Sequence, residues 1–229
     1  MPIYPNLDVE RMKDPMRQYL ANVADIDRTI GRLLKAIDDN GLRDNTVFIY
    51  SSDQGYNVGQ HGIWHKGNAM WVTRDKWAAN KSPKTPRSNI FDTSLRVPTL
   101  IRWPGTIKPG TIIDHVIGGV DFYPTFCAIA GTKPPTSQKV RGQDFSPLLR
   151  GEKTEWNDEL YAEYSQHHYT TNHLRMWRTP KYKLIRDFLN PGKDELYDLK
   201  NDPDELKNLI DSDNPEILKV REELNAKLL

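Results

Sequence analysis

Two adjacent oxygen-bearing side chains, Asp53 and Gln54, lie in the segment Ser51–Gly55, which directly follows a run of strand-forming residues, 46–50. In open α/β sheets, ligands gather at the carboxyl ends of strands, so this segment is the best candidate for a binding site. A carboxylate beside a carboxamide offers hard oxygen ligands, which suit Ca²⁺ or Mg²⁺ better than a soft metal. Asp-Gln-Gly after a strand is also a common turn, and on spacing alone the turn is the more frequent explanation.

A second group of polar side chains lies between residues 61 and 68. Lys66 is a compact cation that could hold an anionic oxygen, and His61 and His65 could transfer protons or bind an oxyanion. The two histidines have the spacing of a zinc pair on a helix, but the glycines of this segment disfavour a helix. Without further support, a surface loop with solvated Lys and His side chains is the simpler interpretation.

The remaining candidates are less specific. Arg87 and Arg96 could bind an anion, although an arginine beside a strand usually has a structural role. Trp71 and Trp77 could stack on a sugar ring, although aromatic residues of a loop often only hold the loop in place. Cys127 is the only cysteine, which excludes an internal disulfide framework and a cysteine-rich zinc site.

The first half of the chain has the pattern of an α/β unit. Residues 1–18 contain three prolines and are expected to be irregular. Apolar residues then recur with helical period, so we predict a helix over 17–40 that ends at Gly41. Residues 46–50 lack polar alternation, which is typical of a strand buried on both faces in a parallel sheet. The polar stretch from 56 to 94 lacks clear periodicity, which is typical of a functional loop or a disordered segment.

The rest of the chain predicts one more strand and helix, followed by a small sheet. A strand is expected over 96–103, a helix over 121–130 and a helical turn at 145–149. Four short strand candidates follow, at 160–164, 174–178, 182–186 and 195–199, and they indicate an antiparallel sheet. Asn214 and Pro215 then have the types expected at the start of a terminal helix. Two units are predicted, residues 1–150 and 151–229.

The composition excludes several classes of protein. The 229 residues carry 32 Lys and Arg against 31 Asp and Glu, so no basic field favours nucleic acid. No apolar run approaches the roughly 20 residues that span a membrane. The first residues lack the basic and apolar regions of a signal peptide, so none is expected at this start. A globular, mixed α/β protein is predicted.

Taken together, the segments resemble the sulfatase family, within the alkaline-phosphatase-like superfamily. The resemblance follows the family order along nearly the whole sequence. Its segments are Tyr19 to Asp53, Gly59 to Lys66, Ser94 to Gly105, Asp121 to Thr125, Arg175 to Lys183 and Glu195 to Glu205. It implies part of a mixed sheet flanked by helices, plus a small C-terminal antiparallel sheet with a packed helix.

The resemblance also implies roles for single residues. Asp53 and Gln54 match two ligands of a divalent cation, usually Ca²⁺. Lys66 matches the lysine that contacts the sulfate group; we assign it a catalytic role together with His65, and His61 a place in substrate binding. About twenty residues, 67–86, intervene before the next family segment, which leaves Arg87 as a rival anion contact.

The sequence departs from the family at the nucleophile. The family uses a formylglycine made from a Cys/Ser-x-Pro-x-Arg motif, which does not occur here, and the paired aspartates that complete the cation site are absent too. The resemblance therefore covers the C-terminal half of a sulfatase, and the isolated chain is expected not to hydrolyse sulfate esters. The expected partner is either a missing N-terminal half or, through self-association, a second copy of the chain.

Three functions stay open from the sequence. The first is hydrolysis of sulfate esters, with a sulfated saccharide as the expected substrate. The second is a phosphodiesterase or phosphonate-ester hydrolase of the same superfamily. The third is a non-catalytic remnant that binds carbohydrate or a partner protein. Relatives are often periplasmic, extracellular or lysosomal, and the sequence leaves localisation open.

Overall fold

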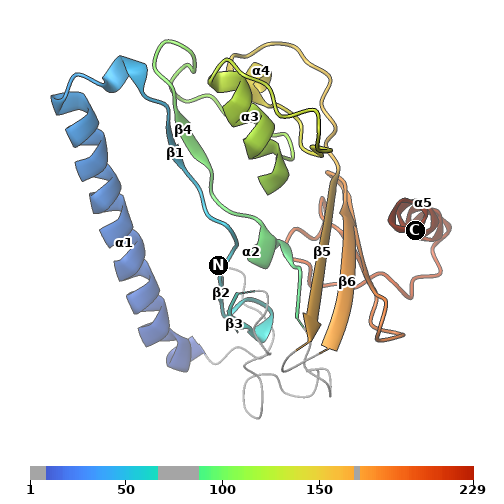
Figure 1. The fold of residues 1–229 in the computed structure, drawn as a ribbon. Helices are drawn as coiled ribbons and strands as arrows, with labels where there is room; N and C mark the ends of the chain where they lie inside the picture. Colours follow the sequence, from blue (N-terminus) through green and yellow to red (C-terminus); the bar gives the residue numbers. More distant parts are fainter. Residues whose placement is uncertain (1–8, 67–87, 168–170) are drawn as a thin grey trace.

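The computed structural model describes residues 9–66, 88–167 and 171–229 (Figure 1). A long helix, α1, stands on one side, next to a ribbon formed by β1 and β4. A four-stranded sheet, β5 to β8, lies on the other side of α2, and α5 covers its outer face (Figure 1). This arrangement confirms the predicted mixed α/β class with a separate C-terminal antiparallel sheet.

The helices are α1 (Val9–Asp39), α2 (Asp92–Leu95), α3 (Phe122–Ile129), α4 (Ser146–Leu149) and α5 (Pro215–Leu228). Turns of 3₁₀ helix occur at η1 (Arg43–Asn45), η2 (Gln60–Gly62) and η3 (Gly119–Asp121). The strands of the first half are β1 (Phe48–Tyr50), β2 (Asn57–Val58), β3 (Trp64–His65) and β4 (Leu100–Arg102). Those of the C-terminal sheet are β5 (Leu160–His167), β6 (Thr171–Arg178), β7 (Tyr182–Asp187) and β8 (Glu195–Asp198).

Helix α1 begins earlier than the sequence pattern indicated. It starts at Val9 and runs through Pro15, so the expectation of an irregular segment was wrong for residues 9–18, and residues 1–8 lie outside the described part of the chain. The buried side chain of Met12 and the ion pair of Lys13 with Glu10 support this first part of the helix. The predicted end is confirmed, because Gly41 has a φ of 69° and donates its N–H to the Asp38 carbonyl.

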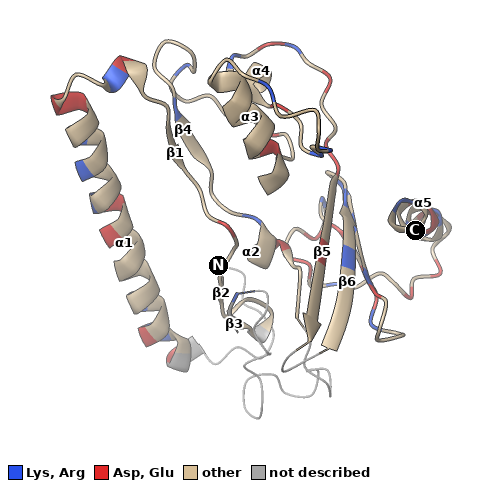
Figure 2. Ribbon diagram, viewed as in Figure 1, with Lys and Arg blue, Asp and Glu red and all other residues tan. Residues whose placement is uncertain are grey.

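The apolar stripe of α1 is mostly exposed, and acidic and basic residues also lie along this helix (Figure 2). Large apolar side chains on it reach the surface at Tyr19, Leu20, Val23, Ile26 and Leu33. At the end of the helix, Asp38 accepts a hydrogen bond from Arg102 of β4 over 2.7 Å. None of the helices in the described part of the chain has the length and apolar character needed to cross a bilayer.

Strand β1 is not the doubly buried parallel strand that its composition indicated. It pairs with β4 in antiparallel register, with Ile49 opposite Ile101, and its residues are only half-buried. Within the described residues these two strands form a sheet of their own. The apolar run correctly predicted a strand. The direction and the burial of a strand depend on its neighbouring strands, which the residues of one strand alone do not indicate.

The C-terminal sheet confirms all four predicted strands. Its order is β5-β6-β7-β8, with every neighbouring pair antiparallel. Strand β7 is buried on both faces, and successive side chains point to opposite sides. Leu184 packs with Leu224 and Leu228 of α5, whereas Ile185 packs with Ile63 and Phe91 of the first half. The sheet therefore has two separate apolar interfaces.

Helix α5 begins as the sequence indicated. The Asn214 side chain accepts a hydrogen bond from the Glu216 N–H over 2.9 Å, and Pro215 occupies the first helical position. A third apolar cluster joins α3 and α4, where Phe145, Leu148 and Leu149 are buried. The predicted division at residues 150 and 151 falls between α4 and β5.

Candidate functional site

Asp53 and Gln54 lie in a bend just beyond the end of β1. The Asp53 side chain is exposed and Gln54 is half-buried. The Ser52 hydroxyl donates to the Gln54 carbonyl oxygen over 3.0 Å and reaches the Asp53 carboxylate at 3.4 Å. Among the described residues, the long contact with Ser52 is the only hydrogen bond of the Asp53 carboxylate. The carboxylate oxygens are therefore open to a ligand.

Gly55 fixes the end of this bend against α2. Its N–H donates to the Ser94 carbonyl oxygen over 2.8 Å. A Cβ atom at position 55 would lie 2.2 Å from the Thr93 carbonyl oxygen, far inside van der Waals contact. The glycine is required here because two backbones approach each other closely.

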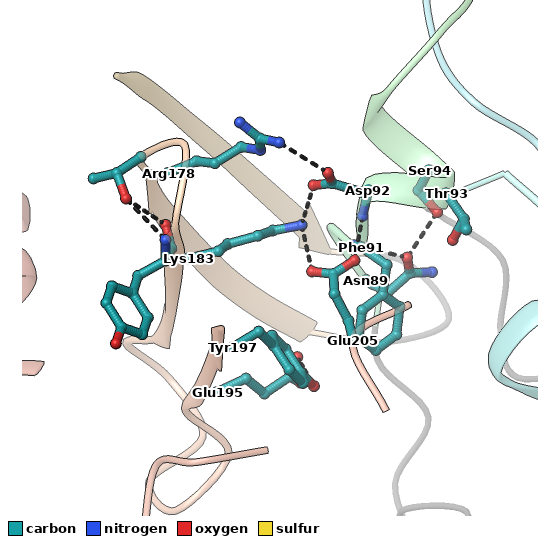
Figure 3. A network of polar contacts seen from close by, with 12 residues as sticks. Asn89, Phe91, Asp92, Thr93, Ser94, Arg178, Lys183, Glu195, Tyr197 and Glu205 are labelled. Atoms are coloured by element: carbon teal, nitrogen blue, oxygen red, sulfur yellow. Dashed lines mark hydrogen bonds and ion pairs between the residues drawn. The ribbon is translucent and has the colours of Figure 1, made fainter. Parts of the chain in front are cut away.

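Asn57 ties the next residues of the chain to the same short helix. Its amide nitrogen donates to the Ser94 hydroxyl over 2.7 Å, and its carbonyl oxygen accepts from the Thr93 hydroxyl over 2.6 Å. The Ser94 hydroxyl in turn donates to Asn89 over 2.7 Å (Figure 3). These buried polar contacts hold the Asp53–Gly55 bend in one place relative to α2.

Lys66 is brought to this bend by a small hairpin. Strands β2 and β3 pair with Asn57 opposite His65, so Lys66 leaves the hairpin at the end where Tyr56 enters it. Tyr56 is two positions after Gln54, and the Lys66 side chain is half-buried. The hairpin thus places a cationic residue at the same end as the two candidate cation ligands.

The segment around the histidines is a turn and a strand, in line with its glycines. His61 lies in η2 with a φ of 54°, and its ring stacks on Phe91 with centroids 3.8 Å apart. Burial, followed by the nearby charge of Lys183, lowers the pKa of His61 to about 4. The imidazole is therefore neutral near pH 7, and the substrate-binding role of His61 remains a prediction.

Two other predicted residues lie outside the described part of the chain. They are the side chain of His65 and the whole of Arg87. The aromatic residues Trp71 and Trp77, considered for sugar stacking, also lie outside it. Their predicted roles remain predictions.

A buried network of charges beside α2 was not singled out from the sequence (Figure 3). Lys183 of β7, fully buried, lies 2.9 Å from an Asp92 carboxylate oxygen and 2.7 Å from a Glu205 oxygen. Arg178 of β6 pairs with the other Asp92 oxygen at 3.2 Å. Glu205 also accepts the backbone N–H of Asp92 over 2.6 Å.

The pKa values of the two carboxylates in this network are shifted in opposite directions. Burial tends to raise the pKa of Asp92, but the charges of Lys183 and Arg178 outweigh it and lower the value. Burial raises the pKa of Glu205 by more than Lys183 lowers it. One signal for the network was present in the sequence, because Lys183 lies between Tyr182 and Leu184 within a predicted strand.

The chemistry of Asp53 and Gln54 fits a hard divalent cation such as Ca²⁺ or Mg²⁺. Their carboxylate and amide oxygens are the atoms that such ions prefer, and the Asp53 oxygens are at the surface. Within residues 9–66, 88–167 and 171–229, no group of three or more His, Cys, Asp or Glu side chains is placed to hold a metal. These two residues would thus supply two ligands of a larger set.

Two family models cover the chain. A model described as Sulfatase matches residues 4–132, and one described as N-sulphoglucosamine sulphohydrolase, C-terminal, matches residues 87–229. The chain belongs to the sulfatase family. The resemblance found in the sequence is thereby confirmed, together with the alkaline-phosphatase-like α/β fold.

The similar proteins are sulfatases of carbohydrates in several cases. An N-acetylglucosamine-6-O-sulfatase of Bacteroides thetaiotaomicron is 34% identical over 201 residues, which are 85% of this chain and 32% of that protein. The solved structure of BT4656 in complex with its substrate D-glucosamine-2-N,6-O-disulfate superposes with a TM-score of 0.78 and 30% identity. It covers 95% of this chain and 40% of that one.

A hydrolase of phosphonate esters also shares the fold. The phosphonate monoester hydrolase of Agrobacterium radiobacter superposes with a TM-score of 0.71 and 25% identity, over 90% of this chain and 38% of that one. The chain thus spans between a third and two fifths of the length of these relatives.

Proposed function

We propose that this chain forms one side of the active site of a hydrolase that cleaves sulfate esters of carbohydrate. The observation that supports the proposal is the register of the β2–β3 hairpin, whose open end is flanked by the bend of Asp53 and Gln54 on one strand and by Lys66 on the other, in a chain of the sulfatase family. Two oxygen ligands and one ammonium group at one place suit a cation and an anionic ester together.

Each residue has a distinct role in this proposal. Asp53 and Gln54 hold the divalent cation through their side-chain oxygens. When bound, the cation screens the negative charge of the sulfate oxygens. Lys66 contributes an ammonium group to one sulfate oxygen, and a half-buried position strengthens this attraction relative to a fully solvated one. Arg87 is the rival for this contact.

The similar proteins favour a sulfated saccharide as substrate. One acts on N-acetylglucosamine 6-sulfate by its name, and another was solved with a disulfated glucosamine. Because no Cys/Ser-x-Pro-x-Arg motif occurs in the 229 residues, we further propose that they do not turn over sulfate esters by themselves. Turnover of an aryl sulfate by the purified chain, lost on Asp53→Ala, would contradict this.

A chimera tests the proposed function directly. Residues 1–229 replace the matching segment of the Bacteroides N-acetylglucosamine-6-O-sulfatase, and release of sulfate from N-acetylglucosamine 6-sulfate is measured. We expect activity that falls by about a hundredfold or more on Asp53→Ala and on Lys66→Ala. The variant Arg87→Ala shows which of the two cationic residues is the main anion contact. A folded chimera that binds the sugar without hydrolysing it would favour a carbohydrate-binding role.

The superposition with a phosphonate monoester hydrolase supports a second candidate, hydrolysis of phosphonate or phosphate esters. The same cation ligands and lysine serve an anionic phosphoryl group as well as a sulfuryl group. The ratio of kcat/KM for a sulfate ester to that for the matching phosphonate ester, measured on one chimera, separates the two candidates. A ratio well above one supports the sulfatase.

A further inference from the structure

We infer that Lys183, in the C-terminal sheet, is a positioning residue for the Asp53–Gln54 bend. This inference rests on the proposed function for its catalytic meaning. Polar contacts form a continuous path from β7, through α2, to Gly55. Each contact along this path is given by the structure.

The path begins with the Lys183 ammonium group. It is fully buried on the face of β7 that turns towards α2, between the carboxylates of Asp92 and Glu205 (Figure 3). A buried ammonium group is tolerated only where its charge is compensated, and these two carboxylates, with Arg178, give a network of zero net charge. Lys183 thus holds Asp92, the first residue of α2, in a defined place.

Glu205 also fixes the position of α2. Its second oxygen accepts the Asp92 N–H, one of the amides at the start of a helix that has no partner within the helix. Glu205 has a φ of 52°, in the left-handed region that side-chain-bearing residues rarely adopt. Such a conformation persists only where the surrounding contacts fix it, which the pair with Lys183 does.

Helix α2 in turn contacts the residues next to the candidate site. Thr93 and Ser94 directly follow Asp92, and they hold the backbone of Gly55 and the side chain of Asn57, on either side of Tyr56. Asp53 and Gln54 directly precede Gly55. Because α2 has only four residues, its own helical hydrogen bonds do little to fix its position, and its outside contacts must do so.

The test measures amide hydrogen exchange at Gly55, whose N–H is bonded to Ser94. The variant Lys183→Met keeps the buried stem and removes the charge. We expect exchange at Gly55 to become at least about tenfold faster in this variant, without added cation. Leu224→Ala is the matched control, because it destabilises the packing of α5 on the opposite face of the sheet.

A purely structural role of Lys183 predicts a different result. Exchange at Gly55 would then accelerate no more in Lys183→Met than in a control of equal global stability, and this outcome would overturn the inference. If Lys183→Met does not fold, Glu205→Asn replaces it, because asparagine accepts a positive φ but is too short to reach the Asp92 N–H. An unchanged Gly55 rate in Glu205→Asn would also contradict the inference.

A Ca²⁺ titration of the same variants separates this inference from the proposed function. If the wild-type chain binds Ca²⁺ through Asp53, we expect Lys183→Met to bind about tenfold more weakly and Leu224→Ala to bind unchanged. If no variant binds Ca²⁺ while Gly55 exchange still depends on Lys183, the cation site fails and the positioning role stands.

Discussion

The N–H of Gly55 donates to the Ser94 carbonyl oxygen over 2.8 Å, and the α-carbon of Gly55 faces the Thr93 carbonyl so closely that no side chain fits. This contact joins the bend after β1 to a short helix that follows it by about forty residues in the sequence. The candidate cation ligands therefore depend on a contact between two backbones, not on local turn geometry alone.

Replacement of this glycine gives the first prediction. Gly55→Ala should lower the free energy of unfolding by about 1–3 kcal/mol, because the added methyl group must displace backbone. Chemical denaturation measures the change. Gly31→Ala is the control, since its Cβ meets nothing within 4 Å and alanine in a helix should stabilise by roughly 0.5–1 kcal/mol. Equal effects of the two substitutions would show that the contact with α2 is absent.

The stability of the chain should depend on pH through His61. Its pKa is about 4 in the folded chain against 6.5 for an ordinary histidine. Between these values the unfolded chain binds a proton at this site and the folded chain does not. The free energy of unfolding therefore falls as the pH decreases from 6.5 towards 4, and this contribution is constant above 6.5.

The size of this effect can be measured against a variant. We expect the His61 contribution to remove about 1.5 kcal/mol between pH 6.5 and about pH 5. Urea denaturation at several pH values, compared with His61→Asn, isolates it, because asparagine tolerates the positive φ and does not titrate. A variant with the same pH dependence as the wild type would mean that His61 is not desolvated by its contact with Phe91.

The exposed apolar stripe of α1 should cause association. We expect the purified chain to self-associate with increasing concentration in sedimentation experiments, because several large apolar side chains at helical spacing are exposed on α1. The double variant Val23→Glu and Ile26→Lys should reduce the association strongly. Arg32→Glu, on the polar face of the same helix, should leave it unchanged. Association that is insensitive to the double variant would point to another surface.

Cation binding gives the last prediction. With two ligands in the chain, we expect Ca²⁺ to bind with a dissociation constant of about 1 mM, and Asp53→Ala to abolish the heat of binding in calorimetry. Asp44→Ala removes another exposed carboxylate and should bind as the wild type does. If both variants bind equally well, the ion is held elsewhere or only by general charge.

Local pattern in the sequence determined most of the secondary structure. Gly41 and Asn214 mark helix ends correctly, because a left-handed residue and a side-chain cap act within one turn. The four strands of the C-terminal sheet were also found, since alternation and turn residues act over a few positions. The sequence also indicated the sulfatase family and the candidate cation ligands, through short segments in a fixed order.

Tertiary structure alone decided how these residues are held. The pair of Lys183 with Asp92 joins residues 91 positions apart, and nothing local to either residue indicates the other. The antiparallel pairing of β1 and the stacking of His61 on Phe91 likewise depend on contacts made only after folding. A buried charge is stable only beside its partner, so its site is set by the assembled fold and not by the order of residues around it.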